Sequence, residues 1–217
     1  MRSADLLMAH VISVNVGRPR PVNTGRRTVL TAIWKAPVQG RVLVRGVNLD
    51  GDDQADRSLH GGPDKAVYAY AIEDTLAWET EVGRELGPGV FGENLTTEGI
   101  DLSGALLGER WRVGTTLLEI VQPRLPCFKL GLRMNDPSFV KRFAQASRPG
   151  AYLRIVEEGD LGAGDPVAVD TSTLPDHGVT LRLVFDAILL DHTLIPQALE
   201  APQLIPSLRE WMTQMMP

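Results

Sequence analysis

The chain has 217 residues, a length that suits one main domain with a small appendage. Its composition of 43% hydrophobic and 23% charged residues excludes a disordered chain, and its formal net charge of -5 excludes a nucleic-acid-binding surface spread over the whole molecule, although it permits a small basic pocket. The single cysteine excludes an intrachain disulfide, so we expect a protein of the reducing cytoplasm.

The N-terminal segment contains two short apolar runs, Leu6–Met8 and Val11–Val14. Asp5 and His10 interrupt these runs, and a Gly-Arg-Pro-Arg breaker follows at 17–20. Neither run is long enough for a membrane-spanning helix, and the pattern is not that of a signal peptide. We therefore expect neither a membrane nor a nucleic acid among the partners.

The first predicted elements along the chain are mostly strands. Alternating branched residues predict strands at Val11–Val16, Thr31–Ile33 and Gly40–Val47. The polar stretch Asn48–Asp56 predicts an exposed loop. Apolar residues at helical spacing then predict a helix over Ala66–Val82.

A tight turn, His60–Lys65, precedes this predicted helix. Gly61 and Gly62 are followed by a proline, and Arg57 and Lys65 place cations on either side. Backbone amides and a helix dipole at such a turn could bind an anionic phosphate. A structural turn with ordinary surface charges explains the same residues, and the pattern leaves both interpretations open.

Three further strands are predicted at Val90–Thr97, Ala105–Val113 and Thr116–Gln122. The first of them contains Phe91–Leu95, in which a glycine is followed by a carboxylate and the amide of Asn94. This pair could fix a heteroaromatic ring by donating and accepting hydrogen bonds. A turn capped by the Asn side chain is the alternative.

Cys127 follows a segment that contains Pro123 and Pro126, and two prolines exclude a helix or a central strand there. The residue is therefore predicted on a rigid loop, with Arg124 near enough to favour the thiolate. A thiolate is a suitable ligand for a soft or high-valent metal. The alternative is that Cys127 is a small buried apolar residue.

The remaining elements complete an α+β fold that is mostly β. A short helix is predicted at Pro137–Ala146, and Ala151–Val156 with Pro166–Val169 predicts a closing hairpin. Many short strands with frequent turns predict a curved, β-barrel-like structure with helices packed on it.

A polar, proline-containing stretch at 170–178 predicts a domain boundary. We assign residues 1–172 to the β-barrel-like domain and 178–217 to a small all-α appendage. Its three predicted helical pieces are Leu181–Leu190, Ile195–Leu199 and Leu204–Met215.

Three stretches together resemble one known family: 53–66 with its His-Gly-Gly-Pro-Asp-Lys turn, 89–96 with Phe-Gly-Glu-Asn-Leu, and 122–130 with Pro-Arg-Leu-Pro-Cys. They are similar to the MOSC domain, named after the C-terminal domain of molybdenum cofactor sulfurases, in its stand-alone YiiM-like branch with a C-terminal three-helix domain. The resemblance covers roughly residues 9–170. It implies a barrel-like domain that carries the molybdenum cofactor, molybdopterin, with Cys127 bound to the metal as the catalytic residue.

The resemblance also implies an activity, because related members reduce N-hydroxylated compounds such as hydroxylamines and amidoximes to amines. The expected cofactor-binding residues are Arg57, His60, Gly61, Gly62, Lys65, Asn94, Arg124 and Lys129. No motif for a flavin, haem or iron-sulfur cluster is present, so electrons are expected from a separate reductase. The predicted three-helix appendage is a candidate docking surface for it. The alternative function is a non-catalytic carrier of the cofactor or of its sulfur.

Overall fold

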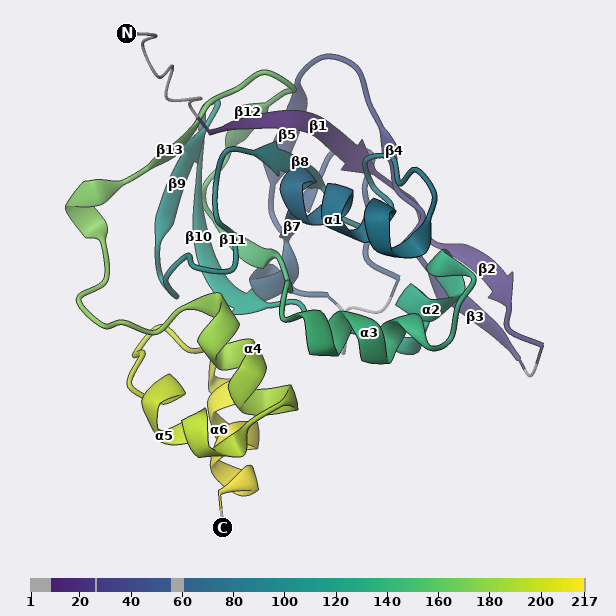
Figure 1. The fold of residues 1–217 in the computed structure, drawn as a ribbon. Helices are drawn as coiled ribbons and strands as arrows, with labels where there is room; N and C mark the ends of the chain where they lie inside the picture. The colour runs from purple at the N-terminus through teal and green to yellow at the C-terminus, as the bar shows by residue number, and fades with distance from the viewer. Residues whose placement is uncertain (1–8, 26, 56–60, 217) are drawn as a thin grey trace, which may run out of the picture.

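The computed structural model describes residues 9–25, 27–55 and 61–216 (Figure 1). Its main sheet is mixed, and its neighbouring strands are antiparallel except for the parallel pair β7–β8. The strand order is β13 (Val167–Val169), β9 (Arg110–Val113), β10 (Thr116–Pro123), β11 (Ala151–Glu157), β7 (Val67–Ala71), β8 (Leu95–Glu98), β1 (His10–Val16) and β4 (Ala36–Pro37). The predicted mostly β, α+β class is confirmed.

The curled sheet does not form a closed barrel, so the barrel expectation needs correction. Its two ends approach each other where His10 forms an isolated bridge with Pro166. The Val11 N–H donates to the Asp165 carbonyl at 2.9 Å, and the Val167 N–H donates to the Ala9 carbonyl at 2.7 Å. These contacts lie mostly before β13, which is only three residues long and pairs instead with β9, so no continuous ladder joins the ends.

Two smaller sheets flank the main one. The first has the order β12 (Gly159–Leu161), β5 (Val42–Arg45) and β6 (Asn48–Leu49). The second is the hairpin β2 (Arg20–Asn23) and β3 (Thr28–Thr31), which projects from the body of the molecule close to α2 (Phe128–Met134) in Figure 1.

Helices cover the sheet in two groups. Figure 1 shows α1 (Ile72–Val82), α2 and α3 (Phe139–Ala146) on one side of the molecule, and α4 (Leu181–Leu189), α5 (Ile195–Ala198) and α6 (Pro206–Met215) gathered at its C-terminal end. The short 3-10 turns are η1 (Pro63–Lys65), η2 (Thr171–Thr173) and η3 (His192–Leu194). The three predicted C-terminal helical pieces are confirmed by α4, α5 and α6. Every helix in the described part of the chain is too short or too polar to cross a bilayer.

The predicted helix Ala66–Val82 was wrong in its first third, because β7 precedes α1. All five residues of β7 are buried, since the sheet is covered on both faces at this strand. A strand of this kind is apolar throughout and is not distinguished from a buried helix by periodicity. The turn at 61–65 therefore contains the single 3-10 turn η1 and leads into a strand, so the expected α-helix does not begin there.

Long-range pairing also overturned the closing hairpin. Strand β11 pairs with β10 and with β7, whereas β13 pairs with β9. The predicted strands Val90–Thr97 and Ala105–Val113 shorten to β8 and β9, because tight turns occupy their first halves. The predicted exposed loop Asn48–Asp56 contains β6 and a buried carboxylate, that of Asp52, whose side chain is 3% exposed.

Candidate functional site

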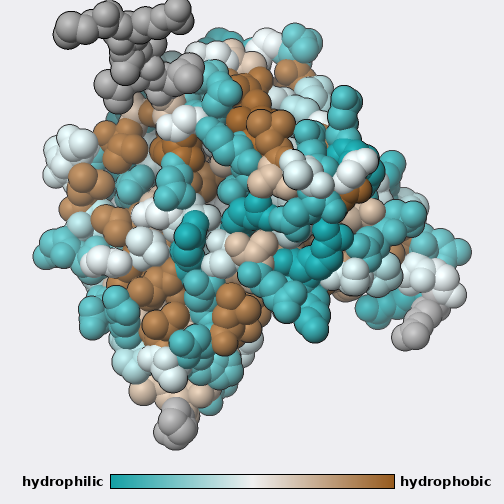
Figure 2. All heavy atoms as spheres, in the orientation of Figure 1, coloured by the Kyte–Doolittle hydropathy of each residue, from teal (hydrophilic) through white to brown (hydrophobic). Residues whose placement is uncertain are grey.

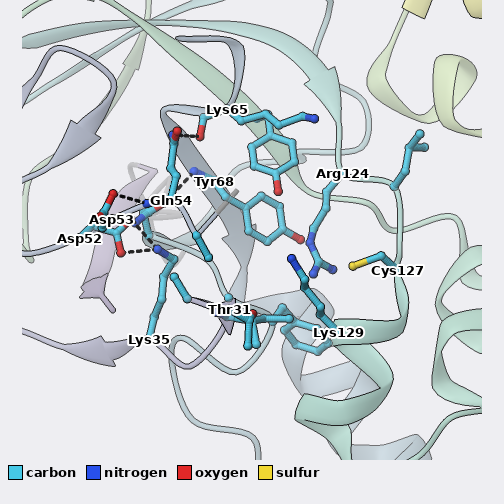
Figure 3. Close-up of a pocket in the computed structure, with 18 residues that line it drawn as sticks. Thr31, Lys35, Asp52, Asp53, Gln54, Lys65, Tyr68, Arg124, Cys127 and Lys129 are labelled. Atoms are coloured by element: carbon cyan, nitrogen blue, oxygen red, sulfur yellow. Dashed lines mark hydrogen bonds and ion pairs between the residues drawn. The ribbon is translucent and has the colours of Figure 1, made fainter. Parts of the chain in front are cut away.

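A cavity of about 120 Å³ opens where five stretches of the chain meet (Figure 3). Its lining residues lie within 31–35, 52–55, 65–68, 91–94 and 124–129, together with Tyr152. Of the nine residues predicted for the site, the cavity brings together Lys65, Asn94, Arg124, Cys127 and Lys129. Arg57 and His60 lie outside the described residues, and Gly61 and Gly62 are not part of the cavity wall.

Cys127 lies at the junction between β10 and α2. Its backbone is extended, with φ -134° and ψ 170°, and the residue is the N-cap of α2. The Leu130 N–H donates to the Cys127 carbonyl at 2.9 Å, which anchors the first turn. The thiol is half-buried, and Figure 3 shows the sulfur pointing toward the Arg124 guanidinium. Because the chain has one cysteine, it can provide one thiolate ligand here.

Arg124 is a buried cation, 5% exposed, on the cavity wall. Its guanidinium carbon lies 5.2 Å from the ring centroid of Tyr68 and 5.8 Å from that of Phe143. Burial acts to lower the pKa of Arg124, but Tyr68, Tyr152 and Cys127 together raise it, so the group stays charged. Its buried Nη1 atom has no hydrogen-bond partner in the described protein. An unpartnered buried donor of this kind is suited to an anion.

The charges on the cavity wall favour an anionic ligand. Lys65 and Lys129 are half-buried cations on η1 and on α2, and they add to the charge of Arg124. The carboxylates on the wall are Asp52 and Asp53, of which the first is paired with Lys35. A cationic pocket therefore exists within a chain whose formal net charge is -5.

The Lys35–Asp52 ion pair fixes the wall opposite Cys127, as Figure 3 shows. Both side chains are less than a tenth exposed. The Asp52 carboxylate also accepts hydrogen bonds from the Gly17 N–H and from the Asn94 Nδ2, each at 2.8 Å. Burial lowers the pKa of Lys35, and Asp52 acts in the opposite direction. The pair thus joins the end of β1, the segment after β3 and the residue before β8.

Asn94 and its neighbour Glu93 are engaged by the protein itself. The Asn94 Oδ1 accepts from the Tyr68 N–H at 3.1 Å, and its Nδ2 also donates to the Asn15 carbonyl at 3.2 Å. Glu93 is fully buried and accepts from the Gly89 and Phe91 N–H groups. Burial raises the pKa of Glu93. Asn94 therefore shapes the wall of the cavity more than it presents groups to a ligand, and Glu93 holds the turn at 89–91 from behind the wall.

The glycine turn is organised by Gln54. The Gly62 N–H donates to the Gln54 Oε1 at 2.7 Å, and the Gln54 Nε2 donates to the Lys65 carbonyl at 3.1 Å and to the Val47 carbonyl at 3.0 Å. Gly62 adopts a φ of +91°, which favours glycine. Its amide, which we expected to bind a phosphate, is thus already used to hold the turn that positions Lys65.

Sequence reasoning missed several members of the wall, namely Lys35, Asp52, Gln54, Tyr68 and Tyr152. Asp52 and Gln54 lie in the stretch predicted as an exposed loop, and Tyr68 lies in the misassigned helix. The Tyr-Ala-Tyr alternation at 68–70, with a period of two, was a signal for a strand. No local signal marked Lys35 or Tyr152, because only the fold brings them to the cavity.

Comparisons with known proteins agree on one family. A family model described as MOSC domain matches residues 56–168. The chain is 36% identical over 154 residues to the protein named Uncharacterized protein YflK of Bacillus subtilis (strain 168), covering 71% of this chain and 70% of that one. It is 30% identical over 164 residues to Protein YiiM of Escherichia coli (strain K12), covering 74% and 71%.

Two further matches extend this picture. A protein of Gibberella moniliformis (strain M3125 / FGSC 7600), named Reductase, is 31% identical over 163 residues, which cover 73% of this chain but 29% of that protein. The crystal structure of YiiM from Geobacillus stearothermophilus superposes with a TM-score of 0.75 at 28% identity, covering 96% of this chain and 100% of that one.

Proposed function

The chain belongs to the MOSC domain family, and on this premise we propose that it binds a molybdenum cofactor and reduces N-hydroxylated compounds, with Cys127 as the protein's ligand to the metal. The observation that supports this most strongly is that the one thiol of the chain shares a cavity wall with a buried guanidinium, that of Arg124, whose Nη1 atom has no hydrogen-bond partner in the described protein. The name of the fungal relative, Reductase, is in line with such an activity.

The residues present fit an anionic, sulfur-bound cofactor. Thiolate is a soft ligand of the kind that such a metal accepts. The unpartnered Nη1 of Arg124 and the nearby cations suit the phosphate and other anionic groups of a pterin cofactor. The cavity, at about 120 Å³, lies below the roughly 300 Å³ of small ligand pockets. It therefore encloses only part of a pterin-sized molecule.

Each residue then has a defined role. Cys127 would bind the metal, and Arg124, Lys65 and Lys129 would hold anionic groups of the cofactor. Gln54 and Asp52 would keep the opposite wall in place through the hydrogen bonds described above. Arg57 and His60 remain predictions from the resemblance. When bound, the cofactor supplies two-electron redox chemistry at molybdenum.

The proposed reaction converts an N-hydroxylated substrate into the amine and water. It takes up two electrons and two protons, and the N–O bond is the bond that breaks. Burial raises the pKa of Tyr152 on the cavity wall, so its hydroxyl keeps its proton near neutral pH and can donate a hydrogen bond. A separate reductase is the proposed source of the electrons.

The test is the molybdenum and pterin content of protein purified from a host that makes the cofactor, compared between wild type and Cys127→Ser. The substitution keeps nearly the same volume, and a melting curve checks that the variant is folded. Turnover of hydroxylamine is measured with reduced methyl viologen. We expect molybdenum and turnover in the wild type and a loss of at least about tenfold in both for the variant.

The other outcomes distinguish the alternatives. Cofactor without turnover in the wild type would favour the non-catalytic carrier. Wild-type protein that contains neither molybdenum nor pterin would contradict the proposal as a whole.

A further inference from the structure

The charges of this chain are unevenly distributed along its length. Residues 6–49 contain seven Lys or Arg and no Asp or Glu, so they carry +7. Because the whole chain carries -5, the rest of it carries -12. A strongly basic segment of an acidic protein is a candidate for recognition of an acidic partner.

In the structure, part of this basic segment lies close to cations on α2 and on the segment after α1. Arg18, Arg20 and Arg27 are exposed on the β2–β3 hairpin and its flanks. Arg84 follows α1, and its Nη2 donates to the carbonyl of Met134 on α2 at 3.4 Å. The β2–β3 hairpin and α2 lie on the same side of the molecule, as Figure 1 shows.

Arg133 on α2 lies near enough to two of these cations for their charges to affect its pKa. Burial, and then the charges of Arg20 and Arg84, lower its pKa, while Glu93 acts in the opposite direction. Its partly buried guanidinium has an Nε atom without a hydrogen-bond partner in the described chain. We define the basic face as Arg18, Arg20, Arg27, Arg84, Lys129 and Arg133.

The arginines of the basic face differ from those elsewhere on the surface. Within the described residues, none of them lies within ion-pairing distance of a carboxylate. Arginines outside the face are mostly paired, with partners such as Asp160 for Arg41 and Glu157 for Arg112. Glu85, next to Arg84 in the sequence, is a carboxylate near the face. Unpaired cations are available to an external partner without first losing an internal one.

The basic face adjoins the cavity. Strand β3 leads directly into the cavity residues at 31–35, and Lys129 belongs to both the face and the cavity wall. Phe128, which follows Cys127, is 47% exposed, and Leu30 on β3 is 51% exposed. Exposed apolar side chains among cations are typical of protein–protein contact surfaces. In Figure 2 the hairpin end of the molecule is covered mainly by hydrophilic residues.

We propose that the basic face docks an acidic electron-carrier protein that reduces the site at the cavity. This inference rests on the proposed function, and it places the docking surface on the hairpin and α2 and not on the C-terminal helices. Two reduced carriers each give up one electron. These two electrons and two protons taken up from the solvent break the N–O bond of the substrate to give the amine and one water molecule.

An acidic protein suits this surface better than a nucleic acid or an anionic membrane. The charge of -12 on the rest of the chain repels an extended polyanion, whereas a compact acidic protein contacts only the basic face. Docking near the cavity also shortens the path of the electron. Binding should therefore be fast at low salt and weaken as salt rises.

The experiment compares Arg18→Glu/Arg27→Glu with the control Arg112→Glu/Arg182→Glu, which makes the same charge change on β9 and α4. The side chains of Arg18 and Arg27 make no contact with the cavity. The probe is an acidic flavodoxin, and its affinity for the full chain is measured by titration calorimetry between about 0.01 and 0.1 M salt. Turnover of hydroxylamine is measured with reduced flavodoxin and with reduced methyl viologen.

We expect the hairpin variant to weaken flavodoxin binding by about tenfold or more and to raise KM for reduced flavodoxin, with methyl viologen turnover unchanged. The control should change binding by less than about twofold. Equal losses in both variants, salt-independent binding, or no binding of flavodoxin to the wild type would overturn the proposal. So would tighter binding of single-stranded DNA or of phosphatidylserine vesicles at the same residues. If the wild type fails with methyl viologen as well, the proposed function fails, while the calorimetry still decides the docking.

Discussion

At the scale of single residues, the candidate site contains a buried charge that is expected to destabilise the fold. Arg124 is buried between the rings of Tyr68 and Phe143, and its Nη1 is unpartnered. A buried cation without full compensation destabilises a fold. A destabilising buried cation is expected at a binding site, because residues that are needed for function often lower the stability of the folded protein.

Arg124→Met therefore separates binding from folding. We expect the cofactor-free variant to be as stable as the wild type or more stable, by up to about 4 kcal/mol, because an apolar side chain of similar size replaces a buried charge. We expect its molybdenum content to fall about tenfold. Urea unfolding and metal analysis measure the two effects. Arg154→Met is the control, since Arg154 forms an ion pair with Asp64 at 2.8 Å on a partly exposed surface. Lower stability with unchanged molybdenum in Arg124→Met would contradict a binding role.

The Lys35–Asp52 pair is a second feature at this scale. Asp52→Ala leaves the buried Lys35 without its partner and removes the acceptor for Gly17 and Asn94. We expect a loss of about 3–5 kcal/mol in the free energy of unfolding. Asp50→Ala breaks the exposed pair with Arg45 and should cost at most about 1 kcal/mol. Similar losses in the two variants, measured by urea unfolding, would show that burial does not distinguish the pairs.

At the scale of elements, a side-chain cluster joins the small sheet to the β9–β10 turn. Arg41 precedes β5, and its Nη2 lies 2.7 Å from the Asp160 Oδ1 on β12. The Asp160 N–H donates to the Thr115 hydroxyl at 2.7 Å. The first contact joins residues that are 119 positions apart in the sequence, and the second joins residues that are 45 positions apart.

This cluster predicts a pH dependence of stability. Arg41 first, and then Thr115, lower the pKa of Asp160 in the folded state. The contribution of Asp160 is therefore present above its unfolded pKa and is lost as the pH falls through the lower, folded value. Asp160→Asn should reduce stability at pH 7, and the difference from the wild type should vanish in strong acid. Urea unfolding across the acid range measures this stability difference. Arg41→Gln removes the main cause of the lowered pKa of Asp160, so the pH-dependent part of the stability should be smaller in this variant, over the same pH window. A difference that persists in strong acid would contradict the assignment.

At the scale of the whole molecule, the C-terminal helices share the core of the sheet. Phe185 on α4 is fully buried, and its ring lies edge-on to Phe143 with centroids 6.5 Å apart. Phe143 in turn lies under the Arg124 guanidinium. The Leu181 N–H donates to the Ala105 carbonyl at 2.9 Å, which ties the start of α4 to the loop before β9. The helices thus support the layer behind the candidate site.

Phe185→Ala tests this coupling. We expect a loss of about 3–5 kcal/mol in the free energy of unfolding, in a single transition that includes the sheet. Leu190→Ala, at a side chain that is 48% exposed, is the matched control and should change stability little. Two separate transitions, followed by circular dichroism and tryptophan fluorescence, would instead indicate that residues 178–217 unfold as an independent domain.

The local pattern of the sequence determined what depends on neighbours in the chain. The alternation in β1, the prolines before Cys127 and the apolar spacing of α4 are enough to predict these elements and the rigid position of the thiol. The combined motifs also determined the family, and five of the predicted site residues line one cavity.

The tertiary structure alone decided what depends on distant pairing. The segment before α1 forms the buried strand β7, and the main sheet does not close into a barrel. The fold also brings Lys35, Asp52 and Tyr152 to the cavity that contains Cys127. Asp52 and Asn94, which share a hydrogen bond, lie 42 positions apart. No local propensity encodes such a contact, because its free energy comes from burial and strand pairing that exist only once the chain has folded.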